Sequence, residues 1–121
     1  MTQNNTITHI EIPAPDLAKA ISFYSIVFNW QIQMINEGSY AFFRVGDTDT
    51  GGGLDALLQP AQEKQGAQVV VDVQDIEKTL IDIEAAGGTV TKTKTAIGGG
   101  HGFYGCFRDP NGNHLQIHSR S

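Results

Sequence analysis

The segment His9–Asp16, with the sequence HIEIPAPD, has a counterpart 59 positions later in Gln68–Asp75, with the sequence QVVVDVQD. Each segment begins with a polar residue on a predicted strand and ends with an aspartate that is placed to cap a helix. The apolar residues that follow recur at the same offset, in the pairs Leu17/Ile76, Ile21/Leu80 and Tyr24/Ile83. An internal repeat of this length predicts two similar units, with a functional cavity between or within the copies.

The first unit, about residues 6–58, is predicted to contain a strand, a helix and three further strands. Its opening segment, Thr6–Ile12, alternates polar and apolar residues, which puts Ile10 and Ile12 on one face and His9 and Glu11 on the other. Apolar residues then recur at helical spacing until about residue 29. The remaining predicted strands are 30–35, 40–45 and 54–58, with a turn at Asn36–Ser39 and a glycine triplet at Gly51–Gly53.

The second unit, about residues 66–119, follows a polar linker at 59–65 and repeats the order of the first. A strand at 68–73 precedes a helix that begins at Asp75 and stops at Gly87-Gly88. Three strands are predicted at 89–95, 103–108 and 114–118, the last two joined by the turn Asp109–Gly112. The prediction is an α+β fold in which two βαβββ modules form a curved mixed sheet around a cavity.

Length and composition indicate one compact domain, because the chain has 121 residues, of which 40% are hydrophobic. The formal net charge is −5 and Lys and Arg are not clustered, which argues against a nucleic-acid partner. Residues 1–6 lack the features of a signal peptide, and no apolar run is long enough to span a bilayer. Cys106 is the single cysteine, so an internal disulfide is excluded. We therefore expect a cytoplasmic protein without a membrane partner.

Three motifs resemble the vicinal oxygen chelate superfamily: a strand that ends in Pro13–Asp16, a helix that carries Ser22–Tyr24, and the late segment Phe107–Asn113 (FRDPNGN). This superfamily includes glyoxalase I, bleomycin-resistance proteins and extradiol dioxygenases. The resemblance covers nearly the whole chain, and it implies a homodimer, since relatives pair modules across subunits. The same fold hosts isomerases, dioxygenases, epimerases, thiol transferases and drug-binding proteins, so the fold alone does not give the function.

In metal-dependent relatives, four positions on the concave face hold one divalent ion, here nickel, zinc, manganese or iron. The resemblance implies His9 and Gln68 on the first strand of each unit and Gln116 on the last strand, where relatives usually carry Glu. The fourth position lies among residues 53, 55 and 57, with Asp55 as the candidate ligand. A glutamine is a weak ligand and cannot act as a general base, so the alternative is a protein without metal.

Further side chains are candidates for the substrate cavity. Tyr40, Phe42 and Arg44 share one face of a strand, and an aromatic wall beside a guanidinium suits a planar anionic ligand. The alternative places Phe42 in the core and Arg44 at the rim. The remaining candidates are Glu11, which shares a face with His9, His101 and Phe103 at a glycine-rich loop, and His114 and His118 on the last strand. The alternatives are an exposed loop position for His101, a frayed end for His118 and a turn contact for His114.

Three functions are compatible with these residues. The first is a glyoxalase-like lyase, isomerase or dioxygenase-type enzyme that acts on a small organic molecule with the help of a metal. The second is a metal-free protein of the bleomycin-resistance type that binds a small, antibiotic-like molecule. The third is a regulatory subunit that uses the cavity for sensing.

Overall fold

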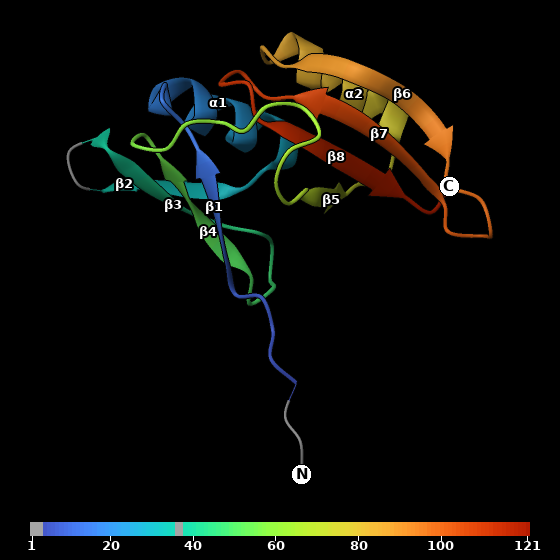
Figure 1. The fold of residues 1–121 in the computed structure, drawn as a ribbon, viewed down its shortest axis with the longest axis horizontal. Coiled ribbons are helices and arrows are strands. Elements are labelled where there is room, and N and C mark those ends of the chain that lie inside the picture. The colour runs from blue at the N-terminus through green and yellow to red at the C-terminus, as the bar shows by residue number, and fades with distance from the viewer. Residues whose placement is uncertain (1–3, 36–37) are drawn as a thin grey trace.

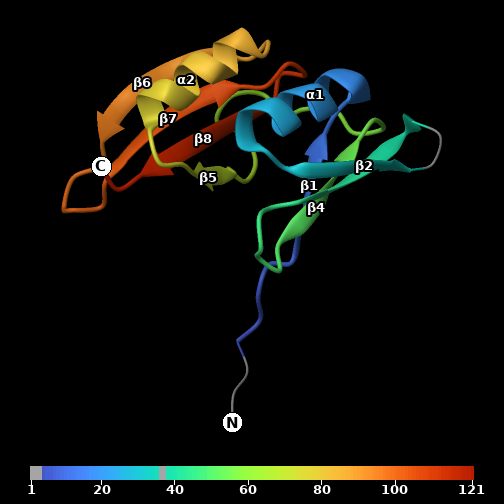
Figure 2. The same ribbon diagram turned by 180° about the vertical axis from the view of Figure 1, so that it is seen from behind.

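The computed structural model describes residues 4–35 and 38–121. It contains two units with the same order of elements, which lie side by side in Figures 1 and 2. The first unit comprises β1 (His9–Pro13), α1 (Leu17–Phe28), β2 (Gln31–Ile35), β3 (Tyr40–Arg44) and β4 (Gly51–Asp55). The second comprises β5 (Val70–Asp72), α2 (Ile76–Ala85), β6 (Thr89–Ala96), β7 (Phe103–Arg108) and β8 (His114–Ser119). The predicted α+β fold of two βαβββ modules is confirmed.

Each unit forms its own four-stranded mixed sheet, in the orders β1-β4-β3-β2 and β5-β8-β7-β6. The pairs β1/β4 and β5/β8 are parallel, and the other neighbours are antiparallel. β1 and β5 are edge strands, and within the described part of the chain they do not pair with each other. One chain therefore does not join its two sheets into a single curved sheet.

The glycine triplet belongs to a strand rather than to the loop before it. The sequence places a strand at 54–58, whereas β4 begins three residues earlier, at Gly51. β4 is hydrogen-bonded to β1 on one side and to β3 on the other, and this double pairing outweighs the low strand propensity of glycine. Residues 36 and 37 of the predicted turn lie outside the described residues.

Both helices begin at the predicted aspartates. Asp16 accepts a hydrogen bond from the backbone N–H of Lys19, and Asp75 accepts one from Lys78, each at 3.1 Å. Such a cap satisfies one of the free N–H groups of the first turn. Neither helix of the described residues has the length and apolarity to cross a membrane.

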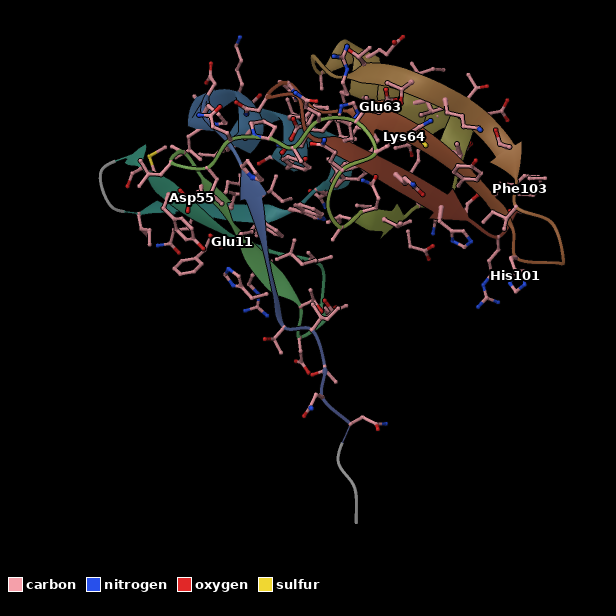
Figure 3. All side chains as sticks on the ribbon, in the orientation of Figure 1. Glu11, Asp55, Glu63, Lys64, His101 and Phe103 are labelled. Atoms are coloured by element: carbon pink, nitrogen blue, oxygen red, sulfur yellow. The ribbon has the colours of Figure 1, made fainter. Side chains whose placement is uncertain are left out.

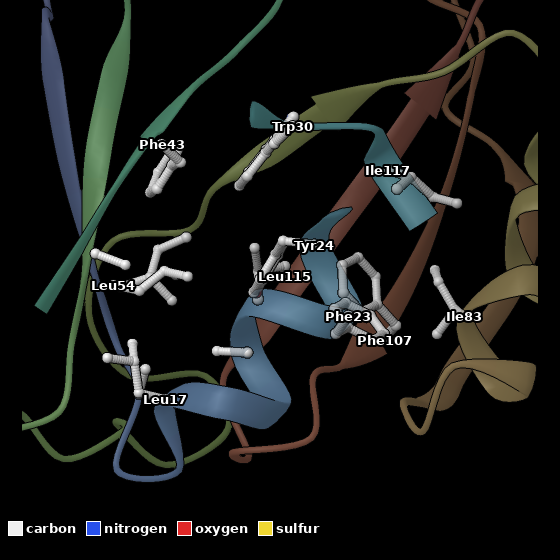
Figure 4. Close-up of a cluster of buried hydrophobic side chains, with 14 of the residues drawn as sticks. Leu17, Phe23, Tyr24, Trp30, Phe43, Leu54, Ile83, Phe107, Leu115 and Ile117 are labelled. Atoms are coloured by element: carbon white, nitrogen blue, oxygen red, sulfur yellow. The ribbon is translucent and has the colours of Figure 1, made fainter. Parts of the chain in front are cut away.

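Buried hydrophobic side chains of both units pack together in one cluster of the described residues. Figure 2 shows α1 and α2 together on the viewer's side of the strands, and the two helices contact each other. In Figure 4, Phe23 of α1 lies against Phe107 of β7, with ring centroids 6.0 Å apart. Trp30 stacks between Tyr24 and Phe43, at centroid distances of 5.0 and 4.5 Å. Because the core is shared, the relative position of the two sheets is set by packing.

Candidate functional site

The side chains of the first sheet that point away from α1 form an exposed polar surface, here called the open face. Strand alternation sends Ile12, Ala41 and Phe43 into the core, and sends His9 and Glu11 the other way. The pairing of β1, β4 and β3 arranges the open face in three rows across the strands. The rows are His9/Gly51/Arg44, Glu11/Gly53/Phe42 and Pro13/Asp55/Tyr40.

Three polar groups converge on the open face. The Glu11 carboxylate accepts hydrogen bonds from Nε2 of His9 and from the hydroxyl of Tyr40. The Tyr40 hydroxyl also lies 3.3 Å from Nε2 of His9. The side chains of His9 and Glu11 are 45% and 36% exposed, so a ligand in solution can reach the cluster.

The electrostatics of this cluster keep Glu11 charged. Burial raises the pKa of Glu11, but hydrogen bonds from Tyr40 and His9 outweigh it, and the net pKa lies below the usual value. Burial and the neighbouring Glu11 carboxylate raise the pKa of Tyr40 to about 12. At neutral pH the cluster therefore presents an ionised carboxylate and a neutral phenol.

Gly53 makes room for this cluster. A Cβ atom at position 53 would lie 1.8 Å from the Tyr40 hydroxyl and 2.5 Å from Glu11 Oε2. Tyr40 can lean across β4 toward Glu11 only because the strand between them carries no side chain there. From the sequence, position 53 was only one of three possible registers for the fourth metal position. The available signal for its spacing role was a glycine triplet after an alternating strand.

Asp55, the candidate for the fourth metal position, lies on the open face in the row beside Glu11. Figure 3 shows Asp55 and Glu11 near each other on the first sheet. Asp55 Oδ1 accepts a hydrogen bond of 2.9 Å from the backbone N–H of Leu57, and a side-chain interaction with Asp55 contributes to the lowered pKa of Glu11. The sequence did not determine which residue of this strand faces the site. The strand register places Asp55 on the same face as His9 and Glu11.

The glutamines of the predicted metal site lie on the second unit. Gln68 and Gln116 line a cavity of about 370 Å³ together with His114, Cys106 and Lys92. Burial raises the pKa of the Cys106 thiol, which makes it a poor nucleophile at neutral pH. Gln68 and His114 also line an adjacent cavity that Glu11 borders.

The last three predicted site residues lie at the far end of the second sheet. His118 Nδ1 lies 2.7 Å from Asp72 Oδ1, and its Nε2 lies 2.8 Å from the backbone carbonyl oxygen of His101. Phe103 packs against the hydrophobic core, with the ammonium group of Lys94 4.7 Å from its ring centroid. Figure 3 shows His101 and Phe103 well away from Glu11.

The candidate metal ligands of one chain do not fit a divalent ion. His9 and Asp55 lie on the first sheet, whereas Gln68 and Gln116 lie on the second unit, and amides contribute no charge to offset that of the ion. Nε2 of His9 is already paired with Glu11. Across residues 4–35 and 38–121, no three His, Cys, Asp or Glu side chains are grouped so that they could hold a metal.

Comparison with known proteins gives a consistent family. The sequence model of the glyoxalase/bleomycin resistance protein/dioxygenase superfamily matches residues 6–117. A probable lactoylglutathione lyase of Vibrio parahaemolyticus is 27% identical over 124 aligned positions, which cover 94% of this chain and 90% of that protein. The protein of the same name from Vibrio cholerae is 29% identical, with the same coverage.

Solved structures show the same fold at lower identity. A mutant of a fosfomycin resistance protein from Listeria monocytogenes, in complex with Mn(II) and 1S,2S-dihydroxypropylphosphonic acid, superposes with a TM-score of 0.78. It is 19% identical, and the match covers 96% of this chain and 90% of that one. A lactoylglutathione lyase from Agrobacterium tumefaciens superposes with a TM-score of 0.70 at 18% identity, covering 98% and 96% of the two chains.

Proposed function

Because this chain belongs to the glyoxalase/bleomycin resistance protein/dioxygenase superfamily, we propose that it binds a small organic molecule on the open face of its first sheet. The observation that carries the proposal is the convergence of His9, Glu11 and Tyr40 above Gly53. An exposed face that gathers a carboxylate, an imidazole and a phenol offers both donors and acceptors to a polar ligand.

Glu11 and His9 contact the ligand, and Tyr40 positions the Glu11 carboxylate. The Tyr40 hydroxyl holds the carboxylate, and the carboxylate in turn holds the imidazole ring through Nε2. This leaves Nδ1 of His9 as the ring atom for a ligand, in either a donor or an acceptor role. Phe42 borders the same surface and supplies an apolar contact, its ring edge-on to His9 with centroids 6.4 Å apart.

A second copy of the chain completes the cavity in this proposal. β1 and β5 each have one unpaired edge in the described chain, and Val70 on β5 is 51% exposed. Soluble proteins usually cover or pair such edges. A homodimer that sets β1 of one copy beside β5 of the other would bring the open face opposite Gln68, His114 and Gln116 of the second unit. We place this dimer in the cytoplasm, in keeping with the single Cys106.

A second candidate function is a metal-dependent lyase or isomerase. The names of the Vibrio relatives and the Mn(II) complex of the Listeria protein favour it. His9 would then coordinate the ion together with donors from the second unit of the partner copy. Elemental analysis separates the two candidate functions. The protein is stripped with a chelator and dialysed against nickel, zinc, manganese or iron(II). It should retain about one ion per site only if the function depends on a metal.

The proposed binding is tested by nuclear magnetic resonance on ¹⁵N-labelled protein. A set of small polar organic molecules is titrated, and the backbone amides that shift are assigned. The proposal expects shifts concentrated on β1, β3 and β4, with the largest at residues 9–11 and 51–53. Shifts confined to the second unit, or no shifts with any compound, would contradict it. Light scattering in the same buffer tests the homodimer, which requires twice the 13.1 kDa chain mass.

A further inference from the structure

The first row of the open face places a guanidinium and an imidazole on either side of a glycine. His9 of β1 and Arg44 of β3 are both in register with Gly51 of β4. Neighbouring strands lie about 4.8 Å apart, so the two side chains arise roughly 10 Å from each other. Because Gly51 carries no side chain, the surface between them is bare backbone.

This row borders a cavity of about 380 Å³ at the end of the sheet that lies beyond the His9, Glu11 and Tyr40 cluster. His9, Phe42 and Arg44 line it, together with Gly51 and the polar side chains of Thr8 and Thr48. Phe42 is 48% exposed, which excludes a core position and leaves a hydrophobic surface beside the guanidinium. The cavity thus combines a cationic group, a flat aromatic wall and small polar groups.

The Arg44 guanidinium is free to bind a ligand. The ion pairs found among residues 4–35 and 38–121 do not include Arg44, and its side chain has no hydrogen-bond partner there. Asp49 also lines the cavity, but it forms no ion pair with Arg44 in the described structure. A guanidinium presents five N–H donors in a planar fork that matches the two oxygens of a carboxylate.

We infer that this cavity holds the anionic end of a small organic acid, with its carboxylate on Arg44 and its planar apolar part against Phe42. The inference rests on the proposed function, because it names the class of ligand for the same open face. It adds that the ligand is anionic and that charge recognition comes from Arg44, a residue outside the His9, Glu11 and Tyr40 cluster. The next row along β4 contains Glu11, Gly53 and Phe42, so a ligand longer than its anionic end would extend toward Glu11.

The test compares benzoate with benzamide, a neutral molecule of nearly the same shape. Each is titrated into ¹⁵N-labelled full-length protein, with the amides of Gly51 and Gly52 as reporters. Benzoate should shift the resonances of both amides. Benzamide should bind at least about tenfold more weakly, because it lacks a charge-assisted contact worth about 1.4 kcal/mol. The Arg44→Gln variant should weaken benzoate binding by a similar factor.

Arg120→Gln is the matched control, because it removes the same charge from an exposed residue of the second unit. Benzoate binding should be unchanged in this variant, and thermal unfolding of both variants checks that they fold. Equal binding of benzoate and benzamide, or equal effects of the two arginine variants, would overturn the inference. If neutral compounds shift the amide resonances of residues 9–11 and 51–53 while benzoate does not bind, the inference of an anion site is wrong and the proposed function stands. If no compound shifts the open face, both fail.

Discussion

The hydroxyl of Tyr24 donates a hydrogen bond of 2.7 Å to Asp109 Oδ2, which joins α1 of the first unit to the turn before β8 of the second. Tyr24 is fully buried and Asp109 is 4% exposed. The other carboxylate oxygen of Asp109 accepts hydrogen bonds from the backbone N–H groups of Asn111 and Asn113. The side-chain amide of Asn113 also donates to the backbone carbonyl of Pro13, the last residue of β1. The buried charge is thus fully hydrogen-bonded, and its partners come from both units.

Removal of the Tyr24 hydroxyl should destabilise the whole chain. In Tyr24→Phe, the buried Asp109 carboxylate loses a hydrogen bond that water cannot replace, and the expected loss is about 1–3 kcal/mol in the free energy of unfolding. Urea denaturation of wild type and variant measures it. Tyr40→Phe is the matched control, since the same atom is removed from an exposed cluster, and its loss should stay within about 0.5 kcal/mol. Equal losses in the two variants would contradict the larger contribution assigned to the buried hydrogen bond between Tyr24 and Asp109.

The Tyr40→Phe variant should raise the pKa of Glu11. The Tyr40 hydroxyl is the largest of the contributions that lower this pKa, and burial, which raises it, remains in the variant. Carbon-13 resonances of the Glu11 carboxyl group, followed through a pH titration, give the pKa directly. Since the folded pKa lies below the usual value of 4.5, the stabilisation is present above that pH and is lost as the pH falls through the folded pKa. An unchanged Glu11 pKa in the variant would mean that Tyr40 does not position the carboxylate.

His118 should stabilise the second sheet more at acidic than at alkaline pH. Its hydrogen bond to Asp72, followed by that to the His101 carbonyl, raises the pKa of His118, while desolvation and, to a smaller extent, Arg120 oppose the shift. Both ring nitrogens face acceptors, so both bonds form only when the ring is protonated. A raised folded pKa gives stability that is fully present below the unfolded pKa and is lost as pH rises through the folded pKa.

The measurement is thermal unfolding of wild type and His118→Gln at about pH 5.5 and about pH 8.5. The variant should lower Tm by more at the acidic pH, because only there does the wild type have the imidazolium. His114→Gln, on the same strand, serves as the control. An equal loss at the two pH values would contradict a charged His118.

The repeat, both helix caps and the βαβββ order could be predicted from sequence because they depend on local signals. Asp16 and Asp75 precede apolar residues at helical spacing, and that pattern is sufficient to place α1 and α2. The position of β4 could not be predicted, because glycines have low strand propensity and only pairing with β1 and β3 makes Gly51–Gly53 a strand.

The candidate site was predictable in its parts but not in its assembly. Alternation alone grouped His9 with Glu11, and Tyr40 with Phe42 and Arg44. That these two groups face the same side, with Asp55 beside them, depends on long-range register. Separation of Gln68 and Gln116 from His9 depends on how the two units pack, which no local pattern encodes.

The most direct test of ligand binding on the open face is a comparison of wild type with Gly53→Ala. The new Cβ would collide with the far end of the Tyr40 side chain and with Glu11, so it should displace both without breaking backbone pairing. Small polar molecules are titrated into both ¹⁵N-labelled proteins at the same pH and salt. We predict that compounds which shift residues 9–11 and 51–53 in the wild type bind at least about tenfold more weakly to the variant, while its Tm changes little. Unchanged binding in a variant whose Tyr40 and Glu11 are displaced would contradict the assignment of the site.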